Sequence, residues 1–225
     1  MSAALGSRLA LGGLSARGPW VATGLGFVTV LLVSFVERSR EPAYAADRAL
    51  LGPTLGVVVP LVCYALFEAV YRTERASAVL DPLARHGADR RFLSLGVNGA
   101  LALCTAAVTA VLTALAAASA RAFSDPAFAS DVFASLWSGA LAGAGYAGLF
   151  AVASLFARRG RIAALVLDWL LGSGAGALAL PWPRGHARNL FGGEPVLDGS
   201  QAFAAFVLAA LAVAGVLVAS ARETR

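Results

Sequence analysis

The sequence is built from long apolar blocks that alternate with short segments carrying arginine. Of its 225 residues, 59% are hydrophobic and only 14% are charged, and the mean hydropathy is +0.74. A soluble domain is about half apolar and a quarter charged. Continuous apolar blocks of this length are typical of a chain solvated by lipid. We therefore expect a membrane protein that crosses the bilayer several times.

Six blocks approach or exceed the roughly 20 residues that a helix needs to cross the hydrocarbon core. They lie at residues 19–36, 49–70, 92–119, 132–157, 162–180 and 202–221. Backbone amides in lipid must pair within their own segment or in a closed barrel, and these blocks lack the alternation of barrel strands. The expected fold is all-α, with six transmembrane helices in one domain over residues 1–225.

Arginine counts in alternate connections predict the orientation. With the N-terminus in the cytoplasm, twelve arginines lie inside and six outside. The outer set is Arg38, Arg40, Arg48, Arg121, Arg184 and Arg188. The positive-inside rule therefore favours cytoplasmic N- and C-termini. The tract at residues 43–46 has the small-x-small form of a signal-peptidase site, so cleavage near residue 45 stays an alternative to a first span.

All 18 basic residues are arginine, which excludes a phosphate-binding loop with its essential lysine and Schiff-base catalysis. The arginines are dispersed over short loops, so no nucleic-acid surface is expected. Cys63 and Cys104 lie in apolar blocks without metal-binding spacing. We interpret them as packing residues with no metal or redox role. Two positions before Ser173 stands Leu171, where an intramembrane protease would have glycine, and the last span contains no histidine to act as the base. We expect no catalytic residue, metal or cofactor.

The connection between the second and third blocks contains an apolar stripe on an otherwise charged segment. Ala76, Val79, Leu80 and Leu83 recur at helical spacing. The helix starts either before Ala76 or at the Asp81-Pro82 pair, which resembles an N-cap, and Gly87 is expected to end it. Such a helix at residues 74–87 either rests in the headgroups or docks a soluble partner.

This connection resembles the coupling-helix region of type-2 ATP-binding-cassette exporter permeases. The matching residues are Glu74, Arg75, Ser77, Leu80, Leu83, Gly87, Arg90 and Arg91. The resemblance implies a permease subunit in a bacterial-type cytoplasmic (inner) membrane, paired as a homodimer or with a second permease and driven by a separate ATPase. The residues expected to couple to that ATPase are Glu74, Arg75, Leu80, Leu83, Arg85 and Gly87. The alternative is a structural or regulatory membrane protein without transport activity.

Two polar residues interrupt the apolar blocks. Asp168 and Asn98 each lie seven residues after the arginine that precedes their block, Arg161 and Arg91, roughly 10 Å deep at 1.5 Å per residue. A carboxylate there needs a partner. We expect the two side chains to share a hydrogen-bonded cluster that joins helices, and a proton relay or substrate contact is the alternative. Glu68 is expected to pair locally with Arg72.

Glycine and proline positions indicate how the blocks pack. Small-residue spacing occurs at Gly139/Gly143 and again at Gly172/Gly176, which favours close helix packing within one chain over a dimer seam. Pro53 and Pro60 are expected to bend the second span. The connection at residues 181–200 is compatible with a gate segment or with a plain surface loop.

Overall fold

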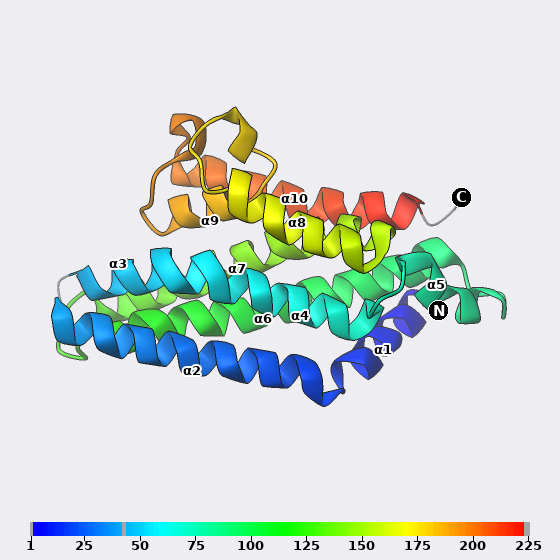
Figure 1. Ribbon diagram of the computed structural model, residues 1–225, viewed down its shortest axis with the longest axis horizontal. Coiled ribbons are helices and arrows are strands. Elements are labelled where there is room, and N and C mark those ends of the chain that lie inside the picture. Colours follow the sequence, from blue (N-terminus) through cyan, green and yellow to red (C-terminus); the bar gives the residue numbers. More distant parts are fainter. Residues whose placement is uncertain (1, 42–43, 223–225) are drawn as a thin grey trace.

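The computed structural model describes residues 2–41 and 44–222, and all regular secondary structure in these ranges is helical (Figure 1). Residues 42 and 43, where the expected cleavage tract begins, lie outside the described residues. The longer helices are α1 (Ser2–Leu14), α2 (Arg17–Arg40), α4 (Val59–Tyr71), α6 (Arg90–Ala120), α7 (Phe128–Ala153), α8 (Ala157–Leu171) and α10 (Gln201–Arg222). The shorter ones are α3 (Ala45–Ala49), η2 (Leu50–Val58), α5 (Ala76–Ala84), η3 (Ser154–Phe156), η4 (Ala177–Ala179), α9 (Pro183–Leu190) and η5 (Val196–Asp198).

Five helical stretches among the described residues are long and apolar enough to cross a membrane. They are Arg17–Arg40, Ala45–Ala84, Arg90–Ala120, Phe128–Leu171 and Gln201–Arg222. The start of α1, the end of α10 and the whole of α5 lie at one end of the bundle (Figure 1). The chain thus has the helical, apolar character of a membrane-embedded protein.

The structure differs from the sequence expectation at the fifth block, residues 162–180. The chain reverses at Ala157, which has a φ of 59°, and α8 runs back beside α7 for only 15 residues. The helix ends at Leu171, because the glycine-rich segment that follows disfavours its continuation. Gly172 and Gly176 are therefore not on a helix face, and the second small-residue seam does not form.

Close packing of α6 against α7 uses the first small-residue seam. A Cβ added at Gly139 or Gly143 would collide with backbone and threonine atoms of α6. Thr109 Oγ1 donates to the Gly139 carbonyl (2.8 Å) and Thr113 Oγ1 to the Ser135 carbonyl (2.7 Å). Hydroxyl-to-carbonyl bonds of this kind join helices where no water competes. The seam lies within one chain.

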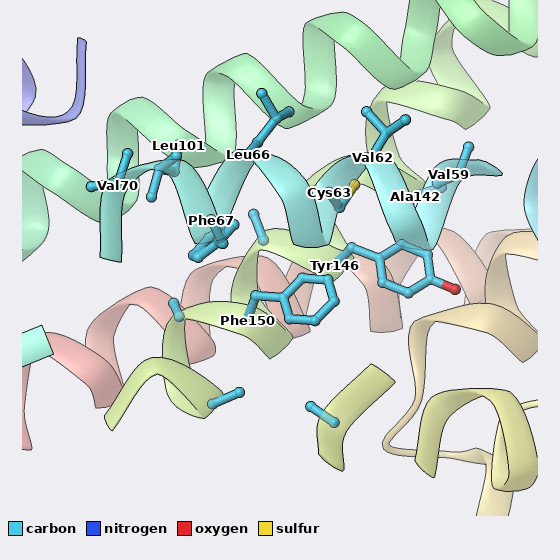
Figure 2. Packing of buried hydrophobic residues seen from close by; sticks show 14 of the residues in the cluster. Val59, Val62, Cys63, Leu66, Phe67, Val70, Leu101, Ala142, Tyr146 and Phe150 are labelled. Carbon is cyan, nitrogen blue, oxygen red and sulfur yellow. The ribbon is translucent and has the colours of Figure 1, made fainter. Parts of the chain in front are cut away.

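The apolar core lies between α4, α6 and α7 (Figure 2). Cys63 and Leu66 of α4 are fully buried, and Cys63 is a free thiol among apolar side chains. Phe150 and Tyr146 lie on the facing helix, α7. The centre of the Phe150 ring is 5.8 Å from that of Phe67 on α4 and 6.3 Å from that of Tyr146. This packing holds α4 in a fixed position against the α6–α7 pair.

The second span is irregular where prolines were expected to bend it. Residues Leu50–Val58 form a π-helix that contains Pro53, and the Val59 N–H donates to the Thr54 carbonyl five residues back. Proline removes one donor from the regular ladder, and wider turns are a common response. Pro60 is the second residue of α4 and follows directly on the π-helix, so a second residue without an N–H donor lies next to the irregular turns.

The N-terminal helix α1 packs on α6. A Cβ at Gly6 would collide with the backbone at Leu93, and one at Gly96 with the backbone at Ala3. Gly6 of α1 and Gly96 of α6 therefore allow the two helices to cross closely.

Candidate functional site

The amphipathic segment of the connection between α4 and α6 forms α5, which begins at Ala76. Of the two starts left open by the sequence, the helix takes the earlier one, and Pro82 lies inside it. Gly87 adopts a φ of +86°, a left-handed conformation that glycine reaches without strain, and the helical path stops there.

The apolar stripe of α5 faces the protein itself. Ala76 and Leu80 are at most 1% exposed, and Val79 and Leu83 pack partly buried against the same core. Leu80 is therefore inaccessible to a partner, contrary to the expectation that it docks an ATPase. The expected coupling residues that do reach the surface are Glu74, Arg75, Arg85 and Gly87.

A fully buried guanidinium anchors the connection next to α5. Arg161, near the start of α8, donates from Nε (3.1 Å) and Nη2 (2.9 Å) to Oε2 of Glu68 on α4. It also donates to the carbonyls of Arg72 and Glu74, and it lies 5.8 Å from the centre of the Tyr71 ring. Arg161 thereby joins two helices and the backbone that leads into α5.

The sequence suggested that Glu68 pairs with Arg72. In the structure it pairs instead with arginines of α8. Its second oxygen, Oε1, lies 3.1 Å from Nε of Arg158. The Arg72 N–H closes the end of α4 by donating to the Glu68 carbonyl, and a φ of 49° at Arg72 turns the chain away. The Arg72 side chain is exposed.

Asn98 of α6 extends the same group of polar contacts. The Tyr71 hydroxyl donates to Asn98 Oδ1 (2.8 Å), and Asn98 Nδ2 donates to Ser94 Oγ (3.1 Å). We call Glu68, Tyr71, Asn98, Arg158 and Arg161 the Arg161 network. It connects α4, α6 and α8 at the end of the bundle that carries α5.

Asp168 belongs to a separate set of contacts, so the expected cluster shared with Asn98 is not formed. Its carboxylate accepts from the Tyr146 hydroxyl (2.9 Å) and from the backbone N–H (3.1 Å) and Nε (3.3 Å) of Arg184. Asp168 is fully buried and Arg184 is 5% exposed. We call Tyr146, Asp168 and Arg184 the Asp168 network.

Arg184 reaches Asp168 because the segment after α8 folds inward. Most of α9 is buried, so residues 181–200 are not a plain surface loop. His186 is buried with its Nε2 2.9 Å from the Leu180 carbonyl, and burial lowers the pKa of its imidazole below the usual value. Asn189 Nδ2 donates to the Gly199 carbonyl (2.9 Å) and closes the segment.

A lateral groove of about 320 Å³ lies next to the Asp168 network. Its walls are apolar residues of η2, α4 and α8, among them Val57, Leu61 and Trp169, and Arg184 also lines it. Among the described residues, no three His, Cys, Asp or Glu side chains gather in a way that could hold a metal ion. The geometry of the described residues provides two buried groups of ion-paired side chains and an apolar groove.

Sequence reasoning missed Arg161 and Arg184 because both were assigned to polar connections. One signal pointed to them: a carboxylate in an apolar block needs a cation, and each of these arginines is close in the chain to such a block. Comparisons with models of known protein families, with curated proteins and with solved structures found no match for this chain.

Proposed function

We propose that this chain is the membrane-spanning permease subunit of a type-2 ATP-binding-cassette exporter and that it couples to a separate ATPase through α5. The observation that carries the proposal is the attachment of α5. The backbone leading into this helix is bound by Arg161 of α8, which is also bonded to Glu68 of α4. A force applied to α5 would be passed to both helices through buried, charge-assisted hydrogen bonds.

The ATPase would contact the outward side of α5 and the turn after it. Arg85, His86 and Gly87 are exposed there, and Glu74 is exposed just before the helix begins. Leu80 and Leu83 support the helix from inside. The absence of lysine agrees with this arrangement. A phosphate-binding loop needs a lysine, so ATP hydrolysis would occur on another polypeptide.

The proposal includes six passes, cytoplasmic N- and C-termini and a bacterial inner membrane. Support comes from the arginine asymmetry of twelve against six and from the common end shared by α1, α5 and the end of α10 (Figure 1). The fifth pass would consist of α8 together with the residues up to 180 that follow it, since α8 alone is shorter than the roughly 20 residues needed.

A permease of this kind would act as a homodimer or with a second permease, with the transport path between the two. The large apolar side chains that α2 and α10 expose, such as Phe35 (71%) and Phe206 (70%), are compatible with lipid or a partner on these faces.

Copurification with an ATPase tests the proposal. The tagged chain is purified in mild detergent from its native membranes, and an associated chain with ATP-binding-cassette motifs is expected, together with ATP hydrolysis in the purified complex. Arg85→Glu should abolish this association. Arg159→Glu, an exposed arginine at the start of α8, serves as the matched control and should retain it.

Recovery of a folded chain without any ATPase would overturn the proposal and favour a structural or regulatory role. So would equal loss of the ATPase in the Arg85→Glu and Arg159→Glu variants, because binding would then depend on charge in general and not on α5.

A further inference from the structure

A second cavity, distinct from both polar networks, opens at the end of the bundle that carries α5. It has a volume of about 480 Å³ and lies between the start of α5, the start of α6, η3 and the end of α10. The residues that line it include Arg75, Ser77, Arg90, Phe156, Val218 and Arg222. Three arginines from three separate helical segments therefore border one cavity.

The cavity has an excess of positive charge. Arg90 is paired with Asp81 at 2.7 Å, which neutralises one of the three guanidinium groups. Within the ranges that the structure describes, neither Arg75 nor Arg222 has a carboxylate within salt-bridge distance. Both side chains are exposed. Among the described residues, the cavity thus offers two cations without a paired carboxylate and a serine hydroxyl, a set of donors suited to a phosphate group.

The opposite wall of the cavity is apolar and open to the outside of the bundle. Phe156 is 67% exposed and Val218 is 46% exposed; Phe156 lies in η3, directly after α7, and Val218 lies near the end of α10. A free phosphate ion would gain nothing from such a wall. A ligand with a charged head and hydrocarbon chains would contact both sides of the cavity.

We propose that this cavity binds the headgroup of an anionic phospholipid. The phosphate lies against Arg75, Arg222 and Ser77, and the acyl chains run along Phe156 and Val218 into the bilayer. The lipid connects the N-terminal end of α5 with the C-terminal end of α10. The proposal is independent of a coupled ATPase, since it rests only on the charge, the apolar wall and their position at the end of the membrane helices.

Native mass spectrometry of the full-length chain in detergent micelles tests the site. Dioleoyl phosphatidylglycerol or dioleoyl phosphatidylcholine is added, and the apparent Kd of the first retained lipid is measured. We expect phosphatidylglycerol to bind more tightly, and the Arg75→Gln/Arg222→Gln variant to weaken it roughly 25-fold, from about fivefold for each arginine next to an anionic lipid. Phe156→Gln should weaken it as well.

The matched control is Arg85→Gln/Arg91→Gln, which removes two exposed arginines from the same end of the bundle but outside the cavity. This control should change the phosphatidylglycerol Kd less than twofold. All variants are first compared with the wild type by thermal unfolding in phosphatidylcholine, so that a folding defect is recognised separately.

Three results would overturn the proposal. Equal weakening by both double substitutions would mean diffuse attraction to the basic surface. Equal affinity for the two lipids would mean that the arginines do not select the headgroup. Displacement of phosphatidylglycerol by millimolar inorganic phosphate, with no effect of Phe156→Gln, would mean that the site takes the free ion.

Discussion

Arg161 and Glu68 lie 93 positions apart in the chain, yet the guanidinium of one donates two hydrogen bonds to a single carboxylate oxygen of the other. Arg161 has no exposed surface, and its remaining donors bind the carbonyls of Arg72 and Glu74. The start of α8 and the end of α4 are thereby joined by an ion pair whose guanidinium is fully buried.

Removing the cation of this pair should destabilise the protein strongly. In Arg161→Leu the Glu68 carboxylate keeps Arg158 but loses its buried partner, and the carbonyls of Arg72 and Glu74 lose a donor. We expect the free energy of unfolding to fall by about 1.5–3 kcal/mol. Thermal unfolding in detergent measures the change. Arg159→Leu, two residues away and exposed, is the control, and equal midpoints for these two variants would contradict the assigned role.

The Asp168 and Arg184 side chains should be energetically coupled. Asp168→Leu leaves Arg184 buried without its anion, whereas Asp168→Leu combined with Arg184→Met removes both charges from an apolar site. The double variant should therefore be more stable than the sum of the single effects predicts, by about 0.5–3 kcal/mol. A double-mutant cycle on unfolding free energies measures this, and strict additivity would show that the contact is unimportant.

The α6–α7 seam should not tolerate a methyl group. Gly143→Ala places a Cβ against Thr109 and the Thr105 carbonyl, so we expect a loss of about 1–3 kcal/mol from overpacking. At Gly24 of α2 there is no atom within 4 Å of an added Cβ, and Gly24→Ala should be neutral or stabilising by up to about 1 kcal/mol. Thermal midpoints of the two variants should move in different directions or differ clearly in size.

Stability should decrease in mild acid because of His186. Burial lowers the pKa of this imidazole in the folded chain below its ordinary value of 6.5. The unfolded chain therefore takes up a proton first as the pH falls, and stability present above about pH 6.5 is lost below it. Unfolding midpoints between pH 7.5 and 5 measure the slope. His186→Gln should reduce it, and His86→Gln, at an exposed position, should leave it unchanged.

Much of the fold could be predicted from the apolar blocks. The blocks at 19–36 and 92–119 lie wholly inside α2 and α6, since an unbroken apolar stretch bounded by charge has few other ways to satisfy its backbone in lipid. The block at 162–180 was wrongly predicted to be one helix, because its alanines and leucines keep it apolar throughout while backbone entropy at Gly172, Gly174 and Gly176 disfavours a helix.

The polar contacts were less accessible from sequence. A partner was correctly required for Asp168, but its choice depended on where α8 ends, and only the shortened helix brings Arg184 back to it. For α5, the periodic stripe predicted one buried side, but no pattern in the chain says whether lipid, a partner or the chain itself covers Leu80. Tertiary packing decides that question.

The π-helix at Leu50–Val58 also affects how the second span should be mutated. Each of its turns holds more residues than an α-helical turn, so the two halves of the span are out of phase. Extending the three- and four-residue spacing of α4 back into Leu50–Val58 would therefore assign residues to the wrong side of the span. The sides differ sharply in exposure there: Val57 is 50% exposed and its neighbour Val58 is 6% exposed. A scan for lipid-facing positions must therefore restart its numbering on each side of this segment.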